Sequence, residues 1–184
     1  MGWFKEVGDG IFYACCAAFK LNPEAQEGLS RFVPAYTKNE ITPQAPRDVD
    51  VCYFSIGNYQ GESNLNYIML RQAVDNGQAK TRIAKSIPCS VLLTFYGPNA
   101  DDDSEYFWSA FQWDNGANSP RSILRKRKIV PIGKPDRPVS LYEVEGTYQR
   151  RRCDVRVNLA YLDVVENDSS HVDTVPDTGF RFQT

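Results

Sequence analysis

The stretch YQRRRCDVRVNLAYLDVV, residues 148–165, has the most regular pattern in the sequence. Apolar residues occupy alternate positions: Cys153, Val155, Val157, Leu159 and Tyr161. The positions between them hold Asp154, Arg156, Asn158 and Ala160. Successive side chains of a β-strand point to opposite faces of the sheet, so this period of two predicts a long strand with one buried face.

Three further segments have the composition of strands. Residues 83–96 place one apolar set on a single face, namely Cys89, Val91, Leu93 and Phe95, and Gly97-Pro98 then ends the segment. Residues 49–56 alternate with both faces at least partly apolar, and residues 139–144 are a shorter strand. The pair Ile129-Val130 predicts one more short strand.

Two segments have helical periodicity. Residues 3–19 carry apolar side chains at spacings of three and four: Phe4, Val7, Ile11, Cys15 and Ala18. A second helix is predicted to begin after Asn99, a residue type that suits the N-cap, and to end by residues 115–116. Its apolar face consists of Ala100, Ser104, Phe107 and Phe111.

The order of these elements decides the fold class. Because strands and helices do not alternate as β-α-β, the sequence predicts an α+β fold, a mainly antiparallel sheet of about four strands with two helices packed on one face. We expect residues 1–184 to form a single domain, since no linker divides them. Within it we expect a proline-rich arm at residues 23–47, a long loop at 57–80 and an extended tail at 166–184.

The charge balance argues against a protein that holds nucleic acid. The chain has 21 basic and 23 acidic residues, a formal net charge of −2. Affinity for nucleic acid comes largely from releasing counterions from phosphates, which calls for a basic surface. General nucleic-acid binding is therefore not expected, although local basic patches remain possible.

The cysteines and the first residues bear on the compartment. The five cysteines have no regular spacing and stand mostly in apolar segments: Cys15, Cys16, Cys52, Cys89 and Cys153. No secretory signal precedes them. The longest apolar stretch, residues 11–19, is shorter than the roughly 20 residues that cross a bilayer. We expect a reducing cytoplasm and no membrane.

A search for chemistry finds no catalytic, cofactor-binding or metal site. The one histidine, His171, stands in the polar tail, and neighbouring Cys15 and Cys16 point in different directions on a helix. The run of Asp101, Asp102 and Asp103 is explained by the positive end of the helix dipole, with metal binding as the alternative. Neither common nucleotide-binding glycine motif occurs. We therefore expect no enzyme and no cofactor.

Two basic runs are candidate subunit or DNA-channel contacts. The first is Arg125, Lys126, Arg127 and Lys128, and the second is Arg150, Arg151 and Arg152. Each run has an alternative interpretation as an ordinary solvated face. In an assembly, the same charges could pair with acidic residues of a neighbouring subunit, at residues 101–105 or at Glu143 and Glu145.

Several motifs resemble one family of phage proteins. The strand VLLTFYG, residues 91–97, ends in an aromatic residue, Tyr and Gly, and leads into a helix through Asn99-Ala100-Asp101. A later strand opens with Tyr and Arg as YQRRRCDVRV, residues 148–157, and a proline-rich approach at residues 43–54 precedes the first strand. Over residues 40–165 the chain resembles the neck or tail terminator proteins of long-tailed bacteriophages.

The resemblance implies a structural virion protein. It implies a homo-oligomer, a six-membered ring that caps the tail tube, contacts the tube and the sheath, joins the tail to the head connector and lets genomic DNA pass through its centre. Assembly would take place in the host cytoplasm. Head-to-tail contacts close such a ring, and the arm, the 57–80 loop, the tail and the first basic run are the expected contact regions.

Three alternatives stay open at this point. The chain could be another ring subunit of the virion, such as a connector, adaptor or tail-tube protein. It could be a small metal-dependent nuclease that uses the carboxylates of residues 101–105, although these lie on one helical turn. It could also be a free-standing nucleic-acid-binding module, which the charge balance disfavours.

Overall fold

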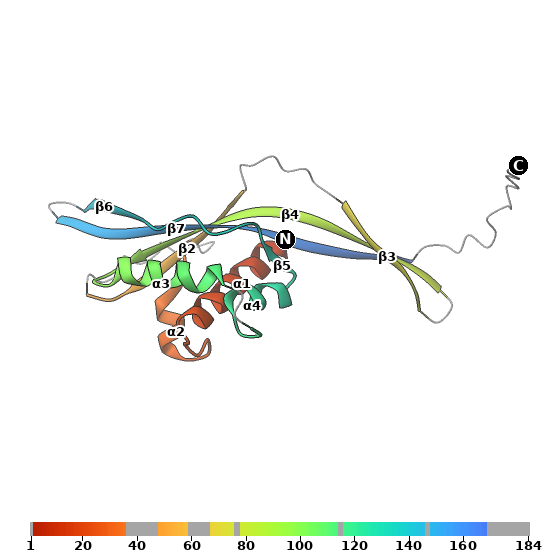
Figure 1. Cartoon of the computed structure of the whole chain (residues 1–184), viewed down its shortest axis with the longest axis horizontal. Coiled ribbons are helices and arrows are strands. Elements are labelled where there is room, and N and C mark those ends of the chain that lie inside the picture. Colours follow the sequence, from red (N-terminus) through yellow and green to blue (C-terminus); the bar gives the residue numbers. More distant parts are fainter. Residues whose placement is uncertain are drawn as a thin grey trace, which may run out of the picture.

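The computed structural model of the chain describes residues 2–35, 48–58, 67–75, 78–113, 116–145 and 148–168. Within these residues a seven-stranded sheet forms one layer and four helices form the other (Figure 1). The strands are β1 (Phe32–Pro34), β2 (Val51–Asn58), β3 (Tyr67–Asp75), β4 (Gln78–Tyr96), β5 (Ile129–Pro131), β6 (Val139–Glu145) and β7 (Tyr148–Asp168). The helices are α1 (Trp3–Ala18), α2 (Gln26–Arg31), α3 (Ala100–Gln112) and α4 (Pro120–Lys126).

The sheet is built around β4 and β7, which pair antiparallel over their whole shared length. The register runs from Lys80 opposite Asp168 to Tyr96 opposite Arg152. The strand order is β1-β2-β4-β7-β5, with β3 added to β4 and β6 added to β7. All these pairs are antiparallel except β1 with β2, which is parallel. The predicted α+β class and the mainly antiparallel sheet are confirmed.

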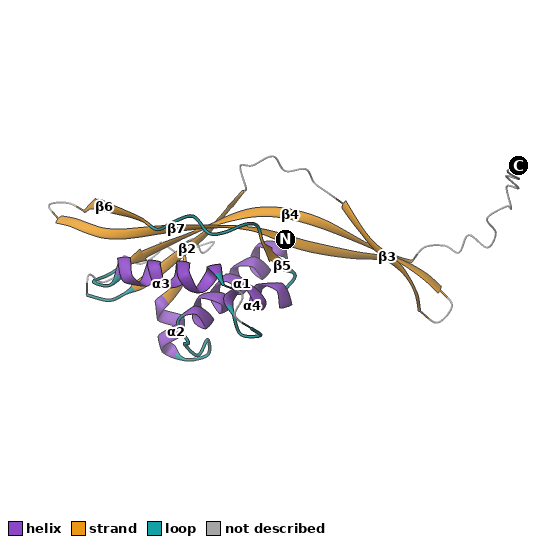
Figure 2. Cartoon of the chain, in the orientation of Figure 1, coloured by secondary structure: helices purple, strands orange, loops and turns teal. Residues whose placement is uncertain are grey.

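All four helices cover the same face of the sheet (Figure 2). The predicted inward set of β7 is buried from Cys153 to Leu159, and so is the predicted set of β4 from Cys89 to Phe95. The largest fully buried side chains come from both layers and include Phe32, Phe107, Phe111, Ile11 and Leu93. The period of two therefore placed the core face correctly.

The number of elements was predicted too low. Seven strands and four helices occur in the described residues, where about four and two were expected. Helix α4 was missed because its seven residues are too few to show a clear helical period and its last two belong to the basic run. Its start is nevertheless signalled, since Ser119 accepts a hydrogen bond from the Ser122 amide at 3.2 Å and Pro120 stands in the first turn.

The predicted 57–80 loop was largely wrong. Residues 67–75 form β3, and β4 already begins at residue 78, so this segment extends the sheet beyond the helices (Figure 1). The sequence of residues 67–75 does not alternate between apolar and polar residues, so a period of two did not mark it as a strand. Residues 59–66 and 76–77 lie outside the described residues.

The predicted arm and tail need similar corrections. Part of the 23–47 segment is regular, because residues 26–31 form α2 and residues 32–34 form β1. The amide of Ala35 also donates to the Phe54 carbonyl at 2.8 Å, which continues the pairing of β1 with β2. Strand β7 continues to Asp168, so the tail begins later than predicted. Residues 36–47 and 169–184 lie outside the described residues.

Candidate subunit-contact surfaces

The first basic run ends α4. Arg125 and Lys126 occupy its last turn, where a positive charge is favourable beside the negative end of the helix dipole. The Lys126 ammonium also donates to the Ala117 carbonyl at 2.8 Å. The Arg127 guanidinium stacks over the Tyr13 ring of α1, with 4.2 Å from its carbon to the ring centroid. Part of this run therefore stabilises the helix and its packing on α1.

Lys128 joins this run to the sheet. Its backbone is left-handed, with φ of 61°, which is the conformation that ends many helices. Its carbonyl accepts a hydrogen bond from the Leu162 amide of β7 at 2.8 Å. The Lys128 side chain is exposed, so the ammonium group remains available to a partner.

The second basic run opens β7 and alternates between the two faces of the sheet. Arg151 points to the helix side and forms an ion pair with Asp101 of α3. Arg150 lies over the Tyr96 ring at 4.3 Å, and Arg152 pairs with Asp154 at 2.8 Å and with Glu143 at 3.8 Å. These contacts lie within one chain, and contacts of the run with other subunits or with DNA stay a prediction.

The structure does not bring the two runs together. The first run lies beside Leu162, whereas the second begins at the other end of the same strand. At about 3.3 Å per residue, the stretch of β7 from Arg151 to Leu162 separates them by about 36 Å. One compact basic patch made of both runs is therefore excluded within a single copy.

The carboxylates in the first turn of α3 bind side chains of neighbouring elements. Asp103 pairs with Arg31 of α2 at 2.6 Å, and Asp101 accepts from the Ser140 hydroxyl at 2.6 Å. Burial raises the pKa of Asp103 above its usual value, and the Arg31 charge opposes that shift. No cluster of three or more potential metal ligands occurs in the described part of the chain. Asn99 stands at the N-cap as predicted, but its side chain bonds to Asp50 at 2.9 Å and not to the helix.

The cysteines are free and buried, as their apolar surroundings predicted. Burial raises the pKa of Cys16 and Cys89 to about 11 and also raises the pKa of Cys15 and Cys52. A thiol reacts as its thiolate, so these groups are unreactive at neutral pH. His171 lies outside the described residues.

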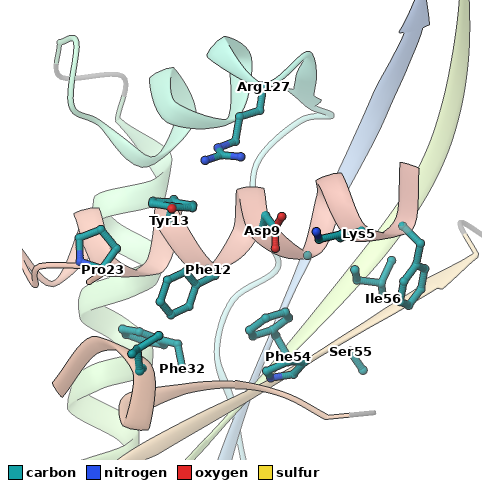
Figure 3. Close-up of a pocket in the computed structure, with 14 residues that line it drawn as sticks. Lys5, Asp9, Phe12, Tyr13, Pro23, Phe32, Phe54, Ser55, Ile56 and Arg127 are labelled. Atoms are coloured by element: carbon teal, nitrogen blue, oxygen red, sulfur yellow. The ribbon is translucent and has the colours of Figure 1, made fainter. Parts of the chain in front are cut away.

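An apolar groove runs between α1 and the strands β1 and β2, with α2 at one end (Figure 3). Its volume is about 700 Å³. The apolar side chains that line it include Phe4, Phe12, Leu29, Phe32, Phe54 and Ile56, and its charged residues are Lys5, Asp9 and Arg127. Phe4 and Leu29 are exposed, although the helical pattern predicted Phe4 to be buried. The first turn of α1 extends past the core, so Phe4 lines the groove.

The sequence contains a signal for this groove. Phe4, Gly8 and Phe12 are spaced by four and therefore lie along one stripe of α1. A methyl group at Gly8 would meet only Ile56, at 3.7 Å, so the glycine leaves a depression between two aromatic residues. All three residues line the groove.

A second apolar surface is the hairpin strand β6. Four of its seven residues are large exposed apolar side chains: Val139, Leu141, Tyr142 and Val144. Val144 is 72% exposed and Tyr142 is 67% exposed, more than any other large apolar side chain in the described residues. Exposed apolar patches of this kind mark sites of protein association.

Among the described residues, every helix is too short or too polar to span a lipid bilayer.

Comparison with known proteins gives the family. A search of the curated proteins found no match. A family model described as phage neck terminator protein matches residues 16–184, well over half of the 184 residues. The chain therefore belongs to the phage neck terminator protein family.

Proposed function

We propose that this chain forms a closed ring at the neck of a long-tailed phage, where it ends the tail and joins it to the head connector. The family match over residues 16–184 carries the proposal. The family is one of structural phage proteins, so the place of the chain is the virion. Six copies in the ring, as expected from the resemblance described above, remain the proposed number.

The surfaces of the described chain suit a subunit that acts through contacts. A ring of identical subunits requires two different patches that fit each other, because each copy meets its two neighbours through different surfaces. The groove and β6 are two separate apolar patches of this kind. The chemistry of the described residues also favours a structural role, since two carboxylates of α3, Asp101 and Asp103, bond to side chains of the same chain.

The proposed partners follow from the proposed position. Beside other copies of this chain, they are the tail tube, the sheath where the tail has one, and the head connector, with genomic DNA passing through the ring as cargo. The two basic runs, residues 125–128 and 150–152, are the proposed contacts with subunits or with the DNA channel. We also propose that residues 1–184 act as one domain and that the ring assembles in the host cytoplasm.

A joining experiment tests this function. Tails are purified from a lysate in which the gene for this chain is disrupted, and they are mixed with filled heads that carry their connector. Adding the purified chain should convert separate heads and tails into joined particles, which electron microscopy counts directly. Tails that join heads equally well without the chain would contradict the proposal. Binding of the chain inside the tube or within the connector would instead indicate another ring subunit of the virion.

A further inference from the structure

We infer that β6 of one copy binds in the apolar groove of the next copy, with Tyr142 and Val144 as the buried anchors. This inference rests on the proposed ring and names the two surfaces that close it. The groove is the one between α1 and the strands β1 and β2, described above (Figure 3). The occupant is a second copy of this chain.

Strand β6 presents one edge for a partner. It pairs with β7 from Val139 opposite Asp154 to Glu145 opposite Tyr148, and among the described residues no strand pairs with its other edge. Tyr142 and Val144 are two positions apart, so their side chains point to the same face. An exposed apolar edge strand is a site where another chain can dock, and aromatic anchors dominate many protein interfaces.

The groove and β6 lie toward opposite edges of the sheet. The order β1-β2-β4-β7 places β1 at one edge, and β6 is added to β7 on the other side. Strand spacings of about 4.8 Å separate β1 from β6 by about 19 Å across four steps. β6 therefore does not lie beside the groove of its own copy, while a neighbour placed head to tail brings the two surfaces together.

The groove is long enough to hold the anchors of β6. The groove follows α1 from Phe4 to Tyr13, which is about 14 Å at about 1.5 Å per residue. The part of β6 from Leu141 to Val144 spans about 10 Å when extended, so it fits within that length. The apolar side chains that the groove exposes to an anchor are Phe4 and Leu29, with Phe12 partly buried between the core and the groove.

The net charges of the two segments differ in sign. Strand β6 carries Glu143 and Glu145 and no basic residue, although Glu143 alternates with the two anchors, points to the other face and accepts a hydrogen bond from the Tyr96 hydroxyl at 2.9 Å. The groove is lined by Lys5 and Arg127 together with one carboxylate, Asp9. The attraction is therefore one of net charge, which orients the partners and suppresses wrong pairings without a direct ion pair from Glu143.

Cysteine cross-linking tests this contact. The substitutions Tyr142→Cys and Leu29→Cys are made in separate proteins, and both positions are exposed in the free chain. The five native cysteines are buried, so the introduced thiols are the reactive ones. Mixing the two proteins under mild oxidation should give a dimer of about twice 20.9 kDa, while neither protein alone gives it. A protein with both substitutions should give a ladder up to the full ring.

The matched control replaces the exposed Trp113, which does not line the groove, with cysteine. Trp113→Cys mixed with Tyr142→Cys should give at least tenfold less dimer than the Leu29→Cys mixture. Light scattering on the same samples shows whether rings form. Rings without the Tyr142–Leu29 cross-link would overturn this inference and leave the proposed function standing. If no rings form with tails and connectors present, both the inference and the proposed function are contradicted.

Discussion

Arg151 of β7 forms an ion pair with Asp101 in the first turn of α3. Asp101 also accepts a hydrogen bond from the Ser140 hydroxyl of β6 at 2.6 Å. One carboxylate therefore joins two strands of the sheet to the helix layer. From the sequence, residues 101–105 of a neighbouring subunit were possible partners of this basic run, whereas Arg151 pairs with Asp101 of its own chain.

The Arg151–Asp101 pair should contribute a small, measurable coupling energy. The Arg151 side chain is 55% exposed, so solvent screens the interaction. We expect a double-mutant cycle of Arg151→Gln and Asp101→Asn, measured by urea unfolding, to give about 0.5–1 kcal/mol. The same cycle with Glu27→Gln in place of Asp101→Asn should give no coupling energy, since Glu27 lies on α2 and Arg151 pairs with Asp101 of α3. Equal coupling in both cycles would show that the pair is not specific.

The stability of the protein should depend on pH through Asp103. Burial raises its pKa above the ordinary 3.8, so the folded state binds the proton at a higher pH than the unfolded state does. As the pH falls from neutral toward 3.8, this group should therefore stabilise the folded protein. The unfolding free energy of the natural protein minus that of Asp103→Asn should therefore increase as the pH is lowered over that range. A difference that falls instead would mean that the Arg31 ion pair outweighs burial.

Replacing Gly8 and Gly10 of α1 with alanine should change the stability of the protein in opposite directions. A methyl group at Gly10 would stand 2.4 Å from the buried Ile129 side chain. Overpacking of a core costs about 1–3 kcal/mol, which outweighs the roughly 1 kcal/mol gained in helix propensity. At Gly8 the nearest atom would be 3.7 Å away, so only the gain applies. We expect Gly8→Ala to raise the melting temperature and Gly10→Ala to lower it.

The glycine pair also tests the packing of α1 on α4. A methyl group at Gly10 would also stand 3.3 Å from the Leu124 side chain of α4, besides meeting Ile129 of β5. If Gly10→Ala were as stable as Gly8→Ala, the close approach of these elements would be wrong. Circular dichroism of both variants on heating gives the answer.

The five thiols should be protected in the folded protein. With a pKa of about 11, Cys16 and Cys89 are ionised to about one part in a thousand at pH 8. We expect mass spectrometry after iodoacetamide treatment at pH 8 to find no labelled cysteine in the folded chain and five after unfolding in urea. Labelling of Cys153 or Cys52 before unfolding would show that the sheet opens far more readily than its packing indicates.

The central part of the fold could be predicted because one physical rule governs it. Strands β4 and β7 are covered by helices on one face, so their buried residues alternate from Cys89 to Phe95 and from Cys153 to Leu159. The apolar face of α3 was predictable for the same reason, with Phe107 and Phe111 fully buried.

Other elements could not be found by that rule. Strand β3 and the first half of β4 form a ribbon outside the helix layer, where alternation is not required. The sequence does contain Asn76-Gly77 between them, a pair typical of two-residue hairpins, and this was the available signal. The parallel pairing of β1 with β2 joins segments far apart in sequence, and no local pattern encodes it.

The contact surfaces were only partly predictable. Charge runs are visible in any sequence, but their partners depend on tertiary structure, as Arg127 on Tyr13 and Arg151 on Asp101 show. The exposure of Tyr142 and Val144 was also hidden, because an edge strand and a half-buried strand have similar compositions. Burial on a partner cannot be read from the residues of one chain.

The mass of the assembled protein tests the central claim most directly. Native mass spectrometry would be run on the purified chain, alone and after addition of tail tubes and connector. We predict a closed species of six times 20.9 kDa, about 125 kDa, either alone or once the tail components are present. A chain that stays at 20.9 kDa in every mixture would contradict the account.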